Sequence, residues 1–236
     1  MKALDPNVAK VELIAGALGH LRDQLVFVGG CAAGLLLTDA AAASARVTYD
    51  VDLLAAVVAL LDYYKLEEEF AQLGFKRDIS QDAPICRWRY GDLEVDLMPM
   101  DSRVLGFSNR WYPHAVETAQ PCILPSGRKI LLISATAFLA TKFEAFADRG
   151  ASDMLGSHDL EDIMNIVDGR PELIDEVSAA RIDLRAYLAE QCATLMQATS
   201  FVDALPGLIF PDENHAARVS MLTQRLGRIA SLHGGV

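Results

Sequence analysis

The spacing of apolar and polar residues divides the chain into an α/β part followed by a mainly helical part. Runs with the length and alternation of β-strands lie at 25–28, 47–54, 85–90 and 93–98, with further strand-like sequence at 121–133. The Gly91-Asp92 pair is a typical hairpin turn. Helical spacing is found at 6–22, 31–37 and 57–73, and from Ser134 it continues almost throughout. We therefore predict an α+β (α/β-like) fold, with a mixed β-sheet and flanking helices at 1–133 and a helical C-terminal domain at 134–236.

The composition is that of a globular protein with a substantial core. Hydrophobic residues make up 52% of the 236 residues and charged residues 22%. The apolar run at 25–37 is too short to cross a bilayer and contains three glycines, at positions 29, 30 and 34. We expect a soluble, cytoplasmic protein without a membrane partner. Its four cysteines are widely spaced and fit reduced, buried thiols better than a zinc or disulfide site.

The net charge of -11 limits the classes of partner. Proteins that bind nucleic acid through its phosphates alone are usually basic, so the acidic balance counts against broad, nonspecific nucleic-acid binding. It leaves room for a local basic patch, and bound metal ions would offset part of the negative charge.

Acidic side chains alternate with apolar ones in two of the predicted strands. Asp50 and Asp52 project to the same side of a strand, where they repel each other strongly unless a cation lies between them. A neighbouring strand can add a third carboxylate, from Asp96 or from Glu94 on the same face. Three oxygen donors suit Mg²⁺, and two such ions would serve in-line displacement at a phosphorus atom. The alternative is a pair of ordinary exposed aspartates on an edge strand.

Gly29 and Gly30 lie between a predicted strand and a predicted helix. Taken singly, they indicate no more than a turn. At this junction, however, the missing Cβ atoms let backbone N–H groups and the helix N-terminus approach a triphosphate.

In this order the motifs resemble those of a known superfamily. FVGGCAAGLLL at 27–37, RVTYDVDLL at 46–54 and LEVDLM at 93–98 are similar to the pattern of the DNA polymerase β-type nucleotidyltransferases. The sequence pattern Arg46-x-Thr48-x-Asp50-x-Asp52 is most similar to that of the AbiEii/AbiGii toxin group. ATKFEAFADRG at 140–150 and SHDLEDI at 157–163 also resemble that group, and the resemblance covers roughly residues 25–168.

The resemblance assigns roles to individual positions. It implies that Asp50, Asp52 and Asp96 hold two Mg²⁺ ions, with Mn²⁺ as a substitute, and that they carry catalysis together with Lys142 and Asp159. It also implies a set of residues that bind ATP, CTP or GTP: Gly29, Gly30, Cys31, Arg46, Thr48, Lys142 and Arg149. At position 31 many members of the superfamily carry Ser, so one hydroxyl contact to phosphate is missing here.

Other interpretations stay open for several of these positions. Arg46 and Thr48 either contact phosphate or cap their loop. Lys142 stands among apolar neighbours and is otherwise a surface lysine with a buried stem. Asp159 and Asp162 share a helix face and either complement the helix dipole or orient Lys142 and the acceptor hydroxyl.

Several side chains outside the motifs also have a possible role at the site. Trp88, Trp111 and Tyr112 either stack on a nucleobase or pack in the core. His158 is expected to start a helix and not to act as a base.

The implied reaction is transfer of NMP from an NTP to an acceptor hydroxyl with release of pyrophosphate. In the toxin group the acceptor is often tRNA, which implies a toxin–antitoxin or phage-defence setting with a cognate antitoxin that need not touch the enzyme. The acidic charge favours a rival, a small-molecule enzyme of the antibiotic-modifying type. A catalytically inactive module that binds nucleotide or a partner is the third interpretation, because fold does not imply function.

Overall fold

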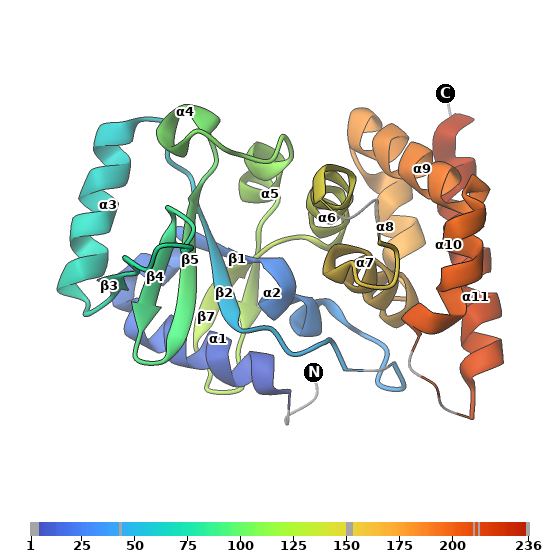
Figure 1. Cartoon of the computed structure of the whole chain (residues 1–236), viewed down its shortest axis with the longest axis horizontal. Coiled ribbons are helices and arrows are strands. Elements are labelled where there is room, and N and C mark those ends of the chain that lie inside the picture. Colours follow the sequence, from blue (N-terminus) through green and yellow to red (C-terminus); the bar gives the residue numbers. More distant parts are fainter. Residues whose placement is uncertain (1–4, 43, 150–152, 210, 212, 235–236) are drawn as a thin grey trace.

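The computed structural model describes residues 5–42, 44–149, 153–209, 211 and 213–234. Figure 1 shows a sheet with its helices on one side of the molecule and a group of helices, α6 to α11, on the other. The α2 helix of the first half packs against α6 and α7 of the second (Figure 1). The predicted combination of a mixed sheet, flanking helices and a helical C-terminal region is confirmed.

Seven strands form one mixed sheet in the described part of the chain, in the order β3-β4-β5-β2-β1-β7-β6. They are β1 (Leu25–Val28), β2 (Asp50–Ala55), β3 (Lys76–Arg77), β4 (Arg87–Tyr90), β5 (Leu93–Pro99), β6 (Gln120–Ile123) and β7 (Lys129–Leu132). The central strand β2 runs antiparallel to β1 and parallel to β5. Both of its edges are therefore paired, and its alternate side chains Val51 and Leu53 are buried in the core.

The register of the central strands fixes which side chains can meet. Asp52 lies opposite Asp96 across the parallel β2–β5 pair, and Asp50 lies opposite Glu94. On its other edge Asp52 lies opposite Val28, the last residue of β1. The acidic positions of β2 and β5 are thereby placed next to the turn that follows β1.

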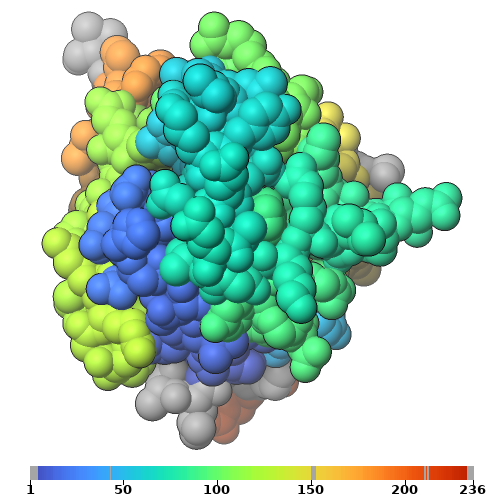
Figure 2. Space-filling model, turned by 90° about the vertical axis from the view of Figure 1, so that its left-hand side faces the viewer, coloured from blue at the N-terminus to red at the C-terminus, as the bar shows by residue number. Residues whose placement is uncertain are grey.

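Helices of the first half pack against the sheet. They are α1 (Pro6–Ala17), the 3-10 helix η1 (Gly19–Asp23), α2 (Gly29–Leu36), α3 (Leu60–Gln72), α4 (Ser102–Leu105) and α5 (Tyr112–Glu117). The Asp5 side chain caps α1 by accepting a hydrogen bond from the Asn7 N–H, and Pro6 occupies the first turn. In Figure 2, α3 runs down the centre of one face and the segment between β3 and β4 projects from the body.

The second half consists of helices that follow β7. They are α6 (Ala135–Arg149), α7 (His158–Gly169), α8 (Leu173–Ala179), α9 (Ile182–Gln197), α10 (Thr199–Ala204), η2 (Leu205–Leu208), α11 (His215–Ala230) and η3 (Ser231–Gly234). Ser157 caps α7 through a hydrogen bond from the Leu160 N–H, as its sequence position predicts. Among the described residues, every helix falls short of the length and apolar character that crossing a membrane requires.

The bounds of several predicted elements need correction. The strand predicted at 47–54 begins only at Asp50, because the backbone at 46–48 bonds to the Asn7 side chain of α1 instead of to the sheet. The helix predicted at 31–37 already begins at Gly29. The helix predicted at 57–73 begins only at Leu60, after the extended backbone of Ala59.

Candidate functional site

Three aspartates from two adjacent strands meet beside the end of β1. Asp50 and Asp52 extend from β2, and Asp96 extends from β5. One carboxylate oxygen of each lies within 4.8 Å of the others. Alternation along the strand sends these side chains to one side while Val51 and Leu53 enter the core. Oxygen ligands at this spacing, offered by three carboxylates, fit a hard divalent cation such as Mg²⁺.

Asp52 has the most strongly perturbed carboxyl group of the three. Burial and the neighbouring charges of Asp50 and Asp96 raise its pKa to about 8, although Lys142 and Arg87 act in the opposite direction. A divalent cation among these oxygens would relieve the repulsion and displace the proton from Asp52. The chemistry of the donor set therefore fits a metal ion.

The turn between β1 and α2 requires glycine for steric reasons. Gly29 has φ of 67°, in the left-handed region that L side chains rarely adopt. A Cβ on Gly29 would lie 2.5 Å from Cγ of Asp52, and a Cβ on Gly30 would lie 2.5 Å from Cγ2 of Thr48 and 3.0 Å from a terminal nitrogen of Arg46. The absence of both Cβ atoms brings the N-terminus of α2 directly against the aspartates. N–H groups in the first turn of a helix have no partner within the helix and suit an anion.

Five alternating charges, which we call the charge ladder, connect this turn with helices α6 and α7. Arg46 Nε lies 3.2 Å from Oδ1 of Asp162, whose Oδ2 lies 2.7 Å from Lys142 Nζ. Lys142 Nζ lies 3.1 Å from Oδ1 of Asp159, and Arg149 Nε lies 2.8 Å from its Oδ2. Three cations and two anions leave the ladder with a net charge of +1 beside the glycine turn.

The inner members of the ladder are deeply buried. Asp162 is fully buried, and Lys142 and Asp159 are nearly so. Burial alone would lower the pKa of Lys142, but the nearby carboxylates of Asp162 and Asp159 raise it. Burial alone would likewise raise the pKa of Asp159, but hydrogen bonds and charge from Arg149 and Lys142 lower it. Lys142 is therefore a buried cation held between Asp159 and Asp162 rather than a surface lysine.

A cleft of about 760 Å³ opens next to the aspartates. It is lined by Arg46, Val47, Tyr49, Asp50, Arg87, Glu94, Arg149, Gly156, Ser157, His158, Asp159 and Glu161. Its residues come from β2 and the segment before it, from the β4–β5 hairpin, from the end of α6 and from the start of α7. The cleft thus joins the aspartates to both outer ends of the charge ladder.

Arg87 is a site residue that the sequence interpretation missed. Its guanidinium donates hydrogen bonds to Asp96, Asp50 and Glu94. The signal that would have found it is the hairpin turn at Gly91-Asp92. Counting back from this turn pairs Tyr90 with Leu93 and places Arg87 opposite Asp96.

Two predicted nucleotide contacts lie deeper than the cleft wall. The Cys31 thiol is buried and donates to the carbonyl oxygen of Asn7, and burial raises its pKa to about 12. Thr48 is also buried, with its N–H bonded to the Asn7 side chain. If Cys31 contacts a phosphate, we therefore expect its backbone N–H, and not its thiol, to make the contact. Thr48 packs against Gly30 and supports the turn.

The tryptophans pack inside the protein. Trp88 lies edge-on to Phe70, and Trp111 lies against Tyr187. Both are buried, so the core interpretation holds for them. The aromatic side chain at the cleft is Tyr49, which is 83% exposed and which the sequence interpretation did not single out.

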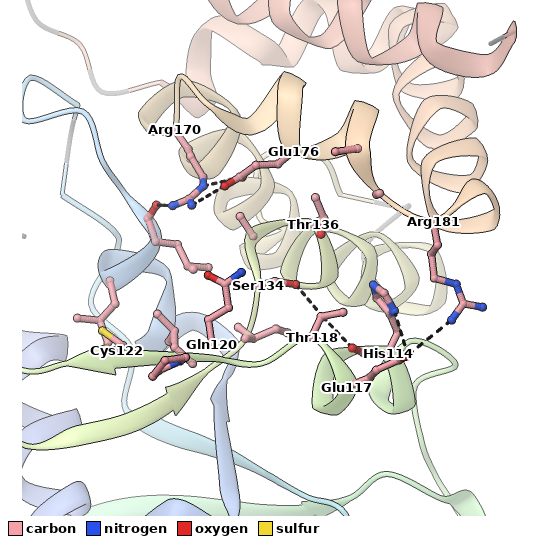
Figure 3. A pocket seen from close by; sticks show the side chains of 18 of the residues that line it. His114, Glu117, Thr118, Gln120, Cys122, Ser134, Thr136, Arg170, Glu176 and Arg181 are labelled. Carbon is pink, nitrogen blue, oxygen red and sulfur yellow. Dashed lines mark hydrogen bonds and ion pairs between the residues drawn. The ribbon is translucent and has the colours of Figure 1, made fainter. Parts of the chain in front are cut away.

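A separate cavity of about 800 Å³ lies between β6, α5 and the start of α6 on one side and α8 on the other (Figure 3). None of the three aspartates lines it. Its arginines are already paired, Arg170 with Glu176 and Arg181 with Asp183. Of these two cavities, the smaller cleft is the one lined by a member of the aspartate cluster, Asp50.

Comparisons with known proteins identify the fold. A scan against protein-family models finds no match, and a search of curated protein sequences finds none either. Among solved structures, the chain is similar to an antigenic nucleotidyltransferase-like protein from Paracoccidioides brasiliensis, with a TM-score of 0.51 and 24% identity over 87% of this chain and 93% of that one. This likeness shows that the chain has the fold of nucleotidyltransferase-like proteins.

Two weaker similarities accompany it. The antibiotic-resistance factor ANT(2'')-Ia matches with a TM-score of 0.48 and 18% identity, over 80% of this chain and 94% of that one. A putative nucleotidyltransferase from H. pylori matches with a TM-score of 0.47 and 13% identity, over 99% of this chain and 97% of that one. The narrower resemblance to the AbiEii/AbiGii group stays a prediction.

Proposed function

We propose that this protein is a nucleotidyltransferase that moves NMP from an NTP to an acceptor hydroxyl and releases pyrophosphate. The observation that carries the proposal is the convergence of Asp50, Asp52 and Asp96 beside the Gly29-Gly30 turn. Either feature alone is common in proteins. Together they support a cation site beside a helix N-terminus that is suited to phosphate.

Asp50, Asp52 and Asp96 would hold the divalent ions, two Mg²⁺ with Mn²⁺ as a substitute, which when bound activate the attacking hydroxyl and stabilise the leaving pyrophosphate. The raised pKa of Asp52 means that this carboxyl gives up a proton when a cation binds near neutral pH. Metal affinity should therefore increase with pH up to about 8.

The triphosphate would bind between the turn and the charge ladder. The N–H groups of Gly29, Gly30 and Cys31 supply donors at the start of α2. The charge ladder has an excess positive charge, carried by Arg46, Lys142 and Arg149, and it begins beside this turn. Asp159 acts on the reaction by holding Lys142 and Arg149 in place, with contacts of 3.1 and 2.8 Å.

For the acceptor we propose the 3′ region of a tRNA, as in a toxin-like enzyme of a toxin–antitoxin or phage-defence pair. The support for this proposal is the motif resemblance around the aspartate pair and at the Lys142 helix. A cognate antitoxin belongs to the same proposal and need not contact the enzyme.

The charges of the cleft favour a second acceptor class, a small cationic molecule. Asp50, Glu94, Asp159 and Glu161 line the cleft, and its arginines at 46, 87 and 149 are each paired with a carboxylate. Such a wall attracts a polycation and repels the phosphates of an RNA.

One assay separates these acceptors from each other and from an inactive protein. Each α-labelled NTP is offered in turn, with Mg²⁺ or Mn²⁺, to total tRNA and to a panel of aminoglycosides, with the Asp52→Ala variant as control. Label in tRNA supports the first acceptor and label in a small molecule the second. An inactive protein that also shows no metal-dependent NTP binding by calorimetry would contradict the proposed function.

A further inference from the structure

Arg87 lies inside the aspartate cluster and not beside it. Its side chain is 18% exposed and reaches from β4 across β5 to β2. Nε and Nη2 each lie 2.8 Å from an oxygen of Asp96, and Nη2 also lies 3.2 Å from Oδ2 of Asp50. One guanidinium therefore engages two of the three carboxylates that form the candidate metal site.

A guanidinium and a divalent cation compete for such a position. The paired contact with both oxygens of Asp96 is the geometry in which arginine binds a carboxylate most strongly. A Mg²⁺ ion needs oxygens at about 2.0–2.1 Å in octahedral directions and tolerates little distortion. A second positive group a few ångströms from the ion would also repel it. Arg87 and a metal ion are thus alternative counter-ions of Asp50 and Asp96.

Glu94 provides a place for the displaced arginine. Its Oε2 accepts a hydrogen bond of 2.6 Å from Nη1 of Arg87, while its Oε1 accepts one from Arg89. Glu94 lies outside the group of three carboxylates that approach one another closely. The contact between Arg87 and Glu94 can therefore persist when the contacts with the aspartates are broken.

We infer that Arg87 is a built-in counter-ion, which neutralises Asp50 and Asp96 in the metal-free protein and moves onto Glu94 when a divalent cation binds. Arg87 is in this view a positioning residue that sets the affinity of the metal site. The inference rests on the proposed function, since it concerns the same aspartates. The positive charge of Arg87 explains how three neighbouring carboxylates can stay close together in the folded protein without a metal ion.

Calorimetric titration with Mn²⁺ alone tests the inference without any assay of transfer. Arg87→Met should bind Mn²⁺ about tenfold more tightly than the wild-type protein, because the internal competitor is gone. Arg89→Met is the matched control. It removes the same charge from the same strand, but Arg89 contacts Asp78 and Glu94 and not the aspartate cluster. Its Mn²⁺ affinity should stay within about twofold of wild type.

Further measurements keep the test decisive if Arg87→Met folds poorly. Arg87→Lys keeps the charge but loses the paired geometry, so its affinity should fall between those of wild type and Arg87→Met. In the wild-type protein, NMR should show slow hydrogen exchange at Nε–H of Arg87 without metal and faster exchange after Mg²⁺ is added.

Several results would overturn the inference. Unchanged or weaker Mn²⁺ binding by Arg87→Met would show that the arginine does not compete with the ion, and unchanged Nε–H exchange on adding Mg²⁺ would show that it does not move. If the wild-type protein binds no Mn²⁺ or Mg²⁺ at all, the proposed function fails together with the inference. If wild type binds metal and the variants do not differ from it, only the inference fails.

Discussion

Gly29 and Asp52 are so close that a Cβ on residue 29 would come within 2.5 Å of Cγ of the Asp52 side chain. The proximity follows from the pairing of Asp52 with Val28, the residue before the turn. A larger residue at position 29 would push the carboxylate out of the cluster, so the turn and the candidate metal site have to be considered as one unit.

Gly29→Ala should therefore do more than strain the backbone at residue 29: it should also displace the Asp52 carboxylate. We expect metal-dependent transfer to fall at least about hundredfold, because the aspartate has to move away from its partners. Gly91→Ala is the matched control. Its φ of 58° is also left-handed, but a Cβ there has no atom within 4 Å. It should cost about 1–2 kcal/mol of unfolding free energy and leave transfer intact. Equal activity of the two variants would contradict this account.

Asp52→Ala should abolish transfer and keep the fold. Loss of a group that only supports a metal ligand costs about 10–100-fold, so loss of the ligand itself should cost at least about hundredfold. The fold survives because the substitution removes repulsion with Asp50 and Asp96. Transfer rates and circular dichroism measured side by side check both parts, with Asp62→Ala on the exposed side of α3 as the control. Full activity of Asp52→Ala would exclude this carboxylate as a metal ligand.

The metal-free protein should lose stability as the pH rises from about 4 to about 8. Asp52 has a folded pKa of about 8, above the unfolded value of 3.8, so over this interval the folded state holds the extra proton. Raising the pH therefore disfavours the folded state, by at most about 1.4 kcal/mol per pH unit. Urea unfolding at pH 5 and pH 8 measures the difference. Saturating Mg²⁺, or the Asp52→Asn substitution, should make the unfolding free energy less dependent on pH. Equal stability of the metal-free protein at pH 5 and pH 8 would refute the prediction.

Lys142→Met should destabilise the protein and weaken nucleotide binding. It removes the cation between Asp159 and Asp162 and leaves buried carboxylates short of a partner, which costs about 3–5 kcal/mol. NTP affinity measured by calorimetry should fall about tenfold, since the excess positive charge of the ladder is lost. Lys65→Met breaks an exposed ion pair with Asp62 and should change neither quantity. A Lys142→Met variant as stable as Lys65→Met would make the buried ladder energetically unimportant.

The sequence was sufficient to predict the elements that carry the aspartates. Alternation around Val51 and Leu53 indicates a strand with Asp50 and Asp52 on one face, and the strand length at 25–28 is the observed one. The boundaries were less predictable where tertiary contacts override the local pattern. Residues 46–48 have a strand-like sequence but bond to Asn7, a residue far away in the chain.

Most electrostatic partners in the site were not specified by the sequence. For Lys142 the sequence left open both a surface position and a role beside Asp159, and the packing of α6 against α7 shows that it is buried between two aspartates. Arg87 was missed because its role depends on the register of a hairpin rather than on a motif of its own. Pairwise charge compensation is set by three-dimensional neighbours, which one sequence does not specify.

Asp52 and Asp96 become neighbours only after the chain has passed through α3, β3 and β4 and β5 has paired with β2. No continuous short segment contains all three carboxylates, so an unfolded chain offers a divalent ion no comparable partner. Such an ion consequently adds its binding free energy to the native state alone. Protection against heat or proteolysis by Mg²⁺ would thus report that β2 and β5 have paired in the native sheet.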